Sequence, residues 1–257
     1  MSEFKVSYGF TEHAPVPQDT GKTGVPEIEF LCELSLWNTI PQPDKAIRFA
    51  PEWFKRLPRE MGMPDAHGLP GLTIKACLPV TDVLSLGFML PLPFDVQLMV
   101  PEDRVSIQMG WAPNVPFQPI EQHHPGQIGA PEDPFQTAMP LKFINPWRIK
   151  VPDGYSVLFS QPFSRPDLPF TCFSGLVDCD RFDTAVNIPF VLTGPVGETL
   201  LPAGTPIAQV LPIRRDTLIK DARSRVSTDH ELSEQDHAKD RKYNEESTYS
   251  RDWRVKK

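Results

Sequence analysis

Alternating apolar and polar positions run through the chain as far as about residue 213, and they predict short β-strands. An alternation of period two places every second side chain on the same face of a strand. One short helix is expected at 51–57, because proline suits a first helical turn and Trp53, Phe54 and Leu57 then form a packing face. The predicted strands comprise residues 27–40, 72–78, 94–100, 104–109, 142–151, 185–192 and 207–213.

The pattern changes after Asp216. Leu218, Ala222 and Val226 recur at every fourth position, which predicts a short helix with one apolar edge. Beyond Thr228 charged residues of both signs are frequent, so this segment alone in water is expected to be a solvated helix or a disordered chain. Its scattered aromatic side chains would suit docking onto a neighbouring subunit; they are Tyr243, Tyr249 and Trp253.

Proline is unusually frequent, with 30 residues among 257. It removes a backbone donor and interrupts helices, so its frequency favours short strands joined by rigid turns. The predicted fold class is therefore mainly β. Three regions follow from these patterns, namely an extended arm at 1–26, a β-rich domain at 27–215 and a charged C-terminal helix or tail at 216–257.

Charge and composition narrow the function classes. A formal net charge of −7 gives no electrostatic reason to expect nucleic acid as a partner. No long apolar run predicts a membrane span, and no basic segment followed by an apolar run suggests a leader, so synthesis in the cytoplasm is expected. The four cysteines lack the Cys-x-x-Cys spacing of common zinc sites, and we expect reduced, partly buried thiols.

Three short motifs follow one another between residues 151 and 215. The first is Val-Pro-Asp-Gly-Tyr at 151–155, the second is Gly-Leu-Val-Asp-Cys-Asp at 175–180, and the third is Leu-Pro-Ala-Gly-Thr-Pro-Ile-Ala-Gln at 201–209. Together they resemble the trimeric dUTPase and dCTP deaminase superfamily. That family has a Pro-x-Gly turn, then Gly-x-Ile-Asp-x-Asp, then a segment with Ile-Ala-Gln, at similar intervals.

This resemblance implies a dUTPase-like β-clip barrel or sandwich over residues 142–213, with an N-terminal extension and a C-terminal tail. It also implies a homotrimer, because the family completes its core by threefold association. Gly154 suits the turn on physical grounds too, since glycine readily adopts a positive φ. Pro189 interrupts the strand at 185–192 and is expected at an edge or a bulge.

The same resemblance implies a candidate site at Asp178, which stands where the family has the base that activates water. An active member would bind a nucleotide with Mg²⁺ between subunits; without that activity no cofactor is expected, and no protein metal site is predicted. The candidate nucleotide-binding residues in this sequence are Ser164, Arg165, Asp180, Arg181 and Gln209.

Several positions depart from the family's catalytic pattern. Arg181 replaces the tyrosine that underlies the nucleobase, and Asp183 replaces a glycine. The phosphate-binding Arg-Ser-Gly is missing, because residues 160–165 read Ser-Gln-Pro-Phe-Ser-Arg and Pro162 cannot donate a backbone hydrogen bond. No glycine follows Gly204, so a glycine-rich C-terminal arm is absent. These departures argue against nucleotide hydrolysis, and the alternative role for the two aspartates of the second motif is to cap backbone amides in a turn.

Three functions are compatible with these patterns. The leading hypothesis is a non-catalytic homotrimeric structural or interaction protein, with a virion and its assembly proteins as one setting. The whole chain also resembles proteins of tailed phages and bacteria whose functions are undetermined. The second is a nucleotide-binding, pyrophosphatase-like or deaminase-like enzyme that uses Asp178. The third is a metal-dependent enzyme that uses His123 or His124 with a partner such as His67, Glu121 or Asp133.

Overall fold

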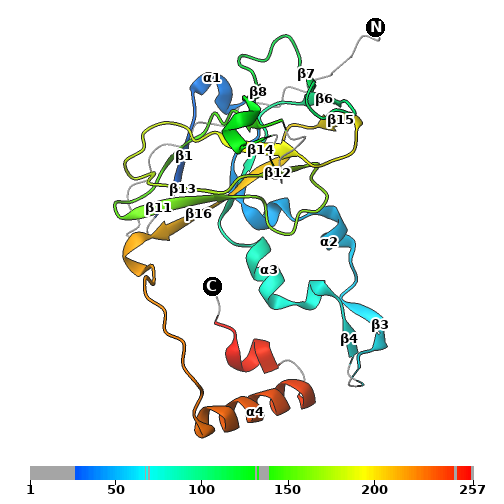
Figure 1. Cartoon of the computed structure of the whole chain (residues 1–257), viewed down its shortest axis with the longest axis vertical. Helices are drawn as coiled ribbons and strands as arrows, with labels where there is room; N and C mark the ends of the chain where they lie inside the picture. Colours follow the sequence, from blue (N-terminus) through cyan, green and yellow to red (C-terminus); the bar gives the residue numbers. More distant parts are fainter. Residues whose placement is uncertain are drawn as a thin grey trace.

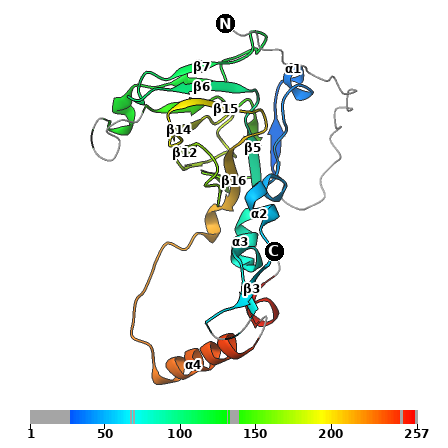
Figure 2. The same cartoon turned by 90° about the vertical axis from the view of Figure 1, so that its right-hand side faces the viewer.

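The computed structural model describes residues 27–255 except 67, 69, 131, 133–138, 246 and 247, so the arm expected at 1–26 lies outside the described residues. Figures 1 and 2 show a β-rich body with a helical extension. A C-terminal segment leaves the body and returns toward that extension. None of the helices in the described part of the chain is long and apolar enough to cross a membrane.

Short strands paired with antiparallel neighbours make up the body. Only a two-stranded ribbon, β3 with β4, projects beyond the body with the helical extension (Figure 1). The strand bounds are β1 Glu29–Leu31, β2 Asp44–Lys45, β3 Glu60–Pro64, β4 Pro70–Leu72, β5 Phe88–Pro91, β6 Val96–Val100, β7 Gln108–Gly110, β8 Ile120–Gln122, β9 Leu141–Phe143, β10 Arg148–Lys150, β11 Tyr155–Ser160, β12 Phe170–Cys172, β13 Gly175–Val177, β14 Ile188–Leu192, β15 Gly197–Leu201 and β16 Pro206–Arg214.

Helices are short except for α4 near the C-terminus. The α-helices are α1 Leu34–Trp37, α2 Glu52–Arg56, α3 Leu78–Leu84 and α4 Asp229–Asn244. Single turns of other helix types are η1 Ala46–Phe49, η2 Ile74–Ala76, η3 Pro125–Ile128, η4 Arg215–Thr217 and η5 Tyr249–Trp253. The predicted mainly β class with a C-terminal helix is therefore confirmed, as is the helix expected after Pro51.

The largest sheet has the strand order β13-β11-β16-β5-β2. Strand β16, which confirms the strand predicted at 207–213, lies in the middle and pairs with β11 from Tyr155 opposite Arg214 to Ser160 opposite Gln209. Residues 206–211 of β16 are buried, and neighbouring strands pair with both of its backbone edges. This register brings the end of β16 beside the turn that precedes β11.

Two further sheets, with strand orders β12-β14-β9-β8 and β15-β6-β7, and the pair β1-β10 complete the body. Strands β6 and β14 confirm the strands predicted at 94–100 and 185–192. The strand predicted at 142–151 is confirmed only in part, because residues 144–147 separate β9 from β10 and the two strands belong to different sheets. The expected place of Pro189 at an edge or bulge is wrong, because β14 lies between β12 and β9. Proline is tolerated there because β12 ends at Cys172, level with Phe190, so Pro189 lies just beyond its last paired residue.

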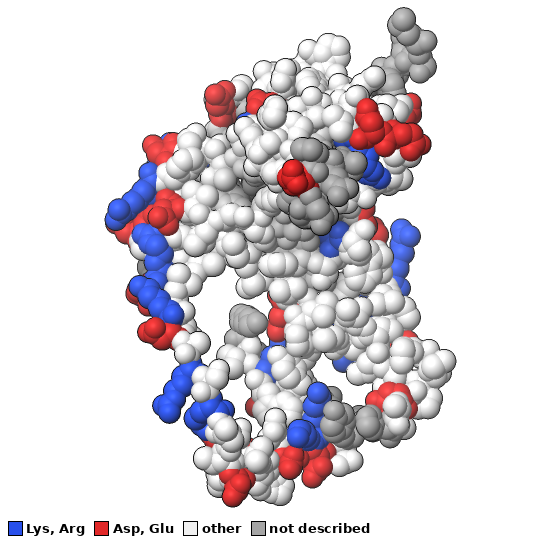
Figure 3. Space-filling view, in the orientation of Figure 1, with Lys and Arg blue, Asp and Glu red and all other residues white. Residues whose placement is uncertain are grey.

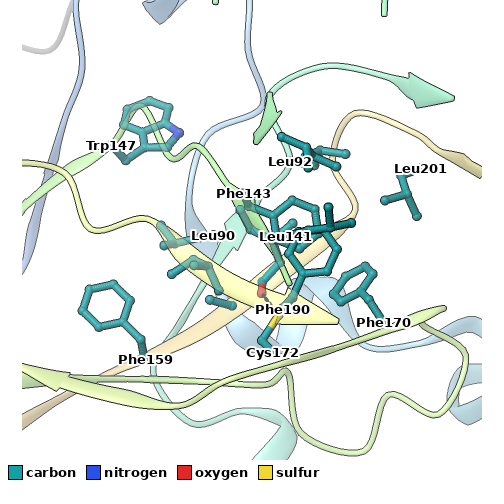
Figure 4. Packing of buried hydrophobic residues seen from close by; sticks show 14 of the residues in the cluster. Leu90, Leu92, Leu141, Phe143, Trp147, Phe159, Phe170, Cys172, Phe190 and Leu201 are labelled. Carbon is teal, nitrogen blue, oxygen red and sulfur yellow. Dashed lines mark hydrogen bonds between the residues drawn. The ribbon is translucent and has the colours of Figure 1, made fainter. Parts of the chain in front are cut away.

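Aromatic side chains join the strands of the four-stranded sheet within the core. Phe143 of β9 stacks on Phe190 of β14 with ring centroids 3.8 Å apart, and Phe170 of β12 packs edge-on against both rings. Figure 4 shows these three rings together, with Leu141 beside them. All three rings are at most 1 % exposed, so the cluster excludes water where the three strands meet.

Two strand predictions in the N-terminal half are wrong in whole or in part. At 27–40 only β1 is a strand, and the chain then forms α1. At 72–78 the chain leaves β4 and forms η2 and the start of α3. The Thr73 hydroxyl accepts a hydrogen bond from the Lys75 N–H, and Pro79 lies in the first turn of α3, so local capping overrides the alternating pattern.

Two other predicted elements are displaced. The strand expected at 104–109 is β7, which begins only at Gln108, because Asp103 accepts hydrogen bonds from the Val105 and Ser106 N–H groups and holds a turn there. The helix expected from Leu218 to Val226 is absent, since residues 218–228 form no regular structure. Helix α4 begins only after Thr228, which makes a capping box with Glu231.

Candidate functional site

The site is built on the turn that leads from β10 into β11. Gly154 has a φ of +86°, a backbone conformation that glycine adopts without a steric cost, as the sequence predicts. Its N–H donates a hydrogen bond of 2.9 Å to an Asp180 carboxylate oxygen. The second motif is thereby attached to the first by a backbone contact.

Asp180 lies after β13, where it meets Arg215 at the start of η4. The Arg215 guanidinium donates to both carboxylate oxygens, at 3.0 Å to Oδ1 and through a second, shorter contact to Oδ2. Only 3 % of the Asp180 side chain is exposed. The hydrogen bonds from Arg215 lower the pKa of Asp180 to about 2, with a smaller contribution from the Gly154 N–H, so this carboxylate is ionised at neutral pH.

Asp178 occupies a different environment from Asp180. Its side chain is 61 % exposed, and it accepts a 2.6 Å hydrogen bond from the Ser156 hydroxyl. The Arg215 Nη1 lies 3.4 Å from Asp178 Oδ1 and also donates to the Tyr155 carbonyl at 2.8 Å. Asp178 is thus the carboxylate of the pair that water or a ligand can reach.

Cys179 lies between the two aspartates and points inward. It is 4 % exposed, and burial, followed by the charges of Asp180 and Asp178, raises the pKa of its thiol to about 11. A thiol with this pKa is protonated at neutral pH and is a poor nucleophile. The expected reduced state is therefore compatible with its environment.

The structure brings together only part of the predicted set of site residues. Asp178 and Asp180 share Arg215, and the Arg181 N–H donates to the Asp178 carbonyl, with the Arg181 side chain exposed. Gln209 lies opposite Ser160, at the far end of β11 from Ser156. This end of the sheet is not the one that carries the aspartates.

Arg165 and Gln209 are engaged in other contacts. Arg165 makes a two-pronged ion pair with Asp167 and donates to the Phe49 carbonyl, with only 11 % of its side chain exposed. Gln209, which is 1 % exposed, donates to the Val83 and Leu86 carbonyls and accepts from the Phe163 N–H. Ser164, next to Arg165, has a φ of +55°.

Sequence reasoning missed Ser156 and Arg215. Ser156 belongs to a strand pattern in which a small buried residue attracts no notice, and Arg215 follows a predicted strand by two residues. Neither position matches a motif of the resembled family as quoted above. The antiparallel pairing of β11 with β13 brings Ser156 to Asp178, and the pairing of β11 with β16 brings Arg215 to the same place. A single sequence carries no direct signal of these registers.

The residues present offer limited ligands for a metal ion. No group of three or more histidine, cysteine, aspartate or glutamate side chains suited to a metal ion occurs in the part of the chain that the structure describes. Magnesium in nucleotide sites is held by one or two carboxylates together with substrate phosphates. Asp178 could supply one such carboxylate, whereas Asp180 is committed to Arg215.

His123 and His124, the histidines of the third hypothesis, lie just before η3. His124 accepts a hydrogen bond from the Gly126 N–H through Nδ1, at 3.1 Å, and so caps the 3₁₀ turn. His123 pairs through its backbone N–H with the Pro140 carbonyl. His67 and Asp133 lie outside the described residues. The structure therefore gives His124 a local structural contact.

Comparisons with known proteins give the following results. No protein-family model matches the chain, and no curated protein matches it. Among solved structures, the chain is similar to the native dUTPase of EIAV, with 12 % identity and a TM-score of 0.31. The similarity covers 56 % of this chain and 87 % of that one.

Proposed function

We propose that this chain is a non-catalytic subunit of a homotrimer with a structural or interaction role, and that it acts in a virion as a decoration or assembly protein. The observation that carries the proposal is the internal pairing of two of the arginines at the candidate residues. Arg215 is paired with Asp180, and Arg165 is paired with Asp167. A nucleotide triphosphate needs cationic donors that are free to meet its oxygens.

The exposed edge beside the aspartates supports association. Strand β13 is an edge strand of the largest sheet, and its Leu176 is 55 % exposed. Phe182, just beyond the aspartates, is 44 % exposed. A strand edge with large apolar side chains in water favours pairing with another chain. The edge and its apolar side chains are therefore suited to contact a neighbouring subunit.

The oligomer is tested by measuring molar mass in solution with light scattering after size-exclusion chromatography. The expected mass is three times the chain mass of 29.0 kDa. Leu176→Asp should release monomers, whereas Leu200→Asp, on β15 and 56 % exposed, is the matched control and should leave the mass unchanged. A monomeric wild-type protein would overturn the proposal.

The absence of catalysis is tested by isothermal titration with nucleoside di- and triphosphates in the presence of Mg²⁺. No binding heat is expected from any of them. The virion setting is tested by quantitative mass spectrometry of purified particles, in which a constant copy number is expected. Loss of the protein from washed particles would contradict that setting without affecting the solution trimer.

A second candidate is a nucleotide-binding enzyme with its site at Asp178 between subunits, and the exposure of that carboxylate is what favours it. Binding heat or nucleotide hydrolysis that disappears in Asp178→Ala would support this candidate and contradict the first. Asp183→Ala is the matched control, because Asp183 is an exposed carboxylate that pairs with Arg148. Loss of binding in both variants would indicate a general effect of charge.

A further inference from the structure

The chain leaves the body just after Arg215 as an exposed connection. We call residues 218–228 the strap; they have no regular structure, and every residue from Asp216 to His230 is exposed. Ile219 and Val226 are 93 % and 90 % exposed, so the strap presents large apolar side chains to water. Figure 3 shows an open gap between this connection and the body. The strap therefore lacks the cover that apolar side chains usually find.

The residues that follow the strap make ion pairs and hydrogen bonds with one another. We call residues 229–255 the clasp, which consists of α4 and η5 and the short connections around them. Arg241 pairs with Asp252, and Arg251 pairs with both Glu245 and Asp252, so charged contacts join η5 to the end of α4. Thr248 is 2 % exposed and donates to the Arg241 and Glu245 carbonyls. The clasp is therefore a small unit with contacts of its own.

The clasp meets the helical extension at α3. The Arg254 guanidinium donates to both carboxylate oxygens of Asp82, at 2.7 and 3.2 Å, and the Asp82 side chain is only 10 % exposed. The end of α3 is in turn fixed to β16, because Gln209 donates to the Val83 and Leu86 carbonyls. Helix α3 thus presents a fixed, negatively charged acceptor that matches the arginine of the clasp.

The strap is long enough to reach a neighbouring molecule. A fully extended segment from 218 to 228 spans on the order of 35 Å, at about 3.3 Å per residue. That length is comparable with the size of a small domain. Within one chain the strap bridges open space without burying its apolar side chains, whereas between chains it could lie along the surface of a neighbour.

We propose that the clasp binds α3 of a second copy of this chain, so that the subunits of the homotrimer exchange their clasps. This inference rests on the proposed function, because it needs a homo-oligomer. Exchange keeps every contact of the clasp, since an identical α3 carries the same Asp82 on each subunit. The partner recognised by Arg254 is therefore the Asp82 carboxylate on α3 of another subunit, and the strap is the hinge.

The test uses cysteines placed beside the ion pair, so that the pair itself stays intact. One chain carries Ser85→Cys at the exposed end of α3, and a second, size-tagged chain carries Val255→Cys, which is 78 % exposed. Both chains also carry Cys32→Ser and Cys77→Ser, which remove the accessible native thiols. The chains are co-expressed, purified as the assembly and treated with a short bismaleimide.

A cross-linked product that contains one chain of each size is the expected result. Arg254→Glu in the tagged chain should abolish this product, and Asp82→Arg in the other chain should restore it. Arg223→Glu, an exposed charge reversal within the strap, is the control that should leave the product unchanged. These variants separate recognition by the ion pair from a general effect of charge.

The outcome also separates this inference from the proposed function. A chain that carries both cysteines provides the decisive comparison. Suppose that the assembly has the mass of a trimer, that the chain with both cysteines is cross-linked only within itself, and that the mixed product is missing. Exchange of the clasp is then excluded, whereas the proposed homotrimer is not contradicted. If the purified protein has the mass of a monomer, the proposed function fails as well.

Discussion

The guanidinium of Arg215 contacts groups from two separate parts of the chain. It donates to the Tyr155 carbonyl at the start of β11 and to the carboxylates of Asp178 and Asp180 after β13. Because Arg215 itself follows β16, these contacts join the ends of three strands. A side chain outside any recognised motif therefore holds the quoted motifs in place.

Removal of Arg215 is predicted to destabilise the body. In Arg215→Ala, the nearly buried Asp180 loses its cation and keeps a desolvated charge, so the melting temperature should fall clearly in differential scanning calorimetry. Arg214→Ala is the matched control, since Arg214 pairs with Asp216 and both side chains are more than half exposed. Equal effects of the two variants would show that the Arg215 contacts contribute little.

The low pKa of Asp180 predicts that the folded protein loses stability in acid. The folded-state pKa of about 2 lies below the ordinary value of 3.8, so the stabilising effect is present at pH values above about 4 and is lost as the pH falls toward about 2. Urea unfolding across this range should show a steeper fall in stability for the wild-type protein than for Asp180→Asn. Parallel curves for the two proteins would contradict the prediction.

At the residue scale the sequence carries part of the site. The positive φ of Gly154 follows from the turn, and the structural alternative for the aspartates anticipates the contact from the Gly154 N–H to Asp180. The partners Ser156 and Arg215 could not be predicted, because their approach depends on the pairing of distant strands. The functional role of the named site residues stays a prediction.

Strand β16 and helix α3 are joined by Gln209. The side chain satisfies two carbonyls at the end of α3 and one N–H of the loop after β11. Because Gln209 is 1 % exposed, water cannot replace these bonds without opening the sheet. The element that carries the acceptor for the clasp is thereby fixed to the core.

Gln209→Leu is predicted to lower the free energy of unfolding. Leucine has a similar size but leaves buried backbone groups unpaired, each at a cost of about 1 to 3 kcal/mol. Chemical denaturation should show the loss, while Gln108→Leu, at an exposed position of β7, serves as the control and should be nearly neutral. An unchanged stability of Gln209→Leu would mean that the loop and α3 find other partners.

Strands were predicted correctly where burial of one face imposes a clear pattern on the sequence. The start of the C-terminal helix was not, because capping residues determine where that helix begins. The apolar residues of β16 and the alternation around Ile149 are consequences of burial, and both strands were predicted. The spacing of Leu218, Ala222 and Val226 indicated a helix, but those side chains have nothing to pack against. The sequence does carry a signal for the true start of α4, which was overlooked: Thr228 and Glu231 form a capping box there.

The whole molecule combines a packed body with an exposed strap, and the proposed assembly would change the surroundings of that strap. Lys220, Arg223 and Arg225 lie within it and are all exposed, so trypsin can reach the isolated chain there. Exchange would place the strap against a neighbouring subunit and slow the cleavage.

Limited proteolysis is therefore predicted to distinguish the two states. Trypsin should cut the strap faster in the dissociated Leu176→Asp variant than in the wild-type assembly, as followed by intact-mass spectrometry over time. The cut product should retain the body, because all strands in the described part of the chain precede the strap. Equal cleavage rates would argue against protection of the strap by a neighbouring chain.

For the whole molecule, the mainly β fold class could be predicted from the sequence, because the frequency of proline and the three motifs both indicate it. The division at 1–26, 27–215 and 216–257 stays a prediction. The threefold assembly also stays a prediction, since contacts between subunits leave no periodic pattern in one chain.

The position of β16 has a consequence for biosynthesis. This strand pairs with β5, and β15 pairs with β6, so two of the sheets need residues that are far apart along the chain. Until residues 197–214 have left the ribosome, β5 and β6 lack these partners and expose edges that can bind other nascent chains. Folding of the body must then wait until residues 197–214 have been made, and a chaperone that shields the early strands would raise the yield.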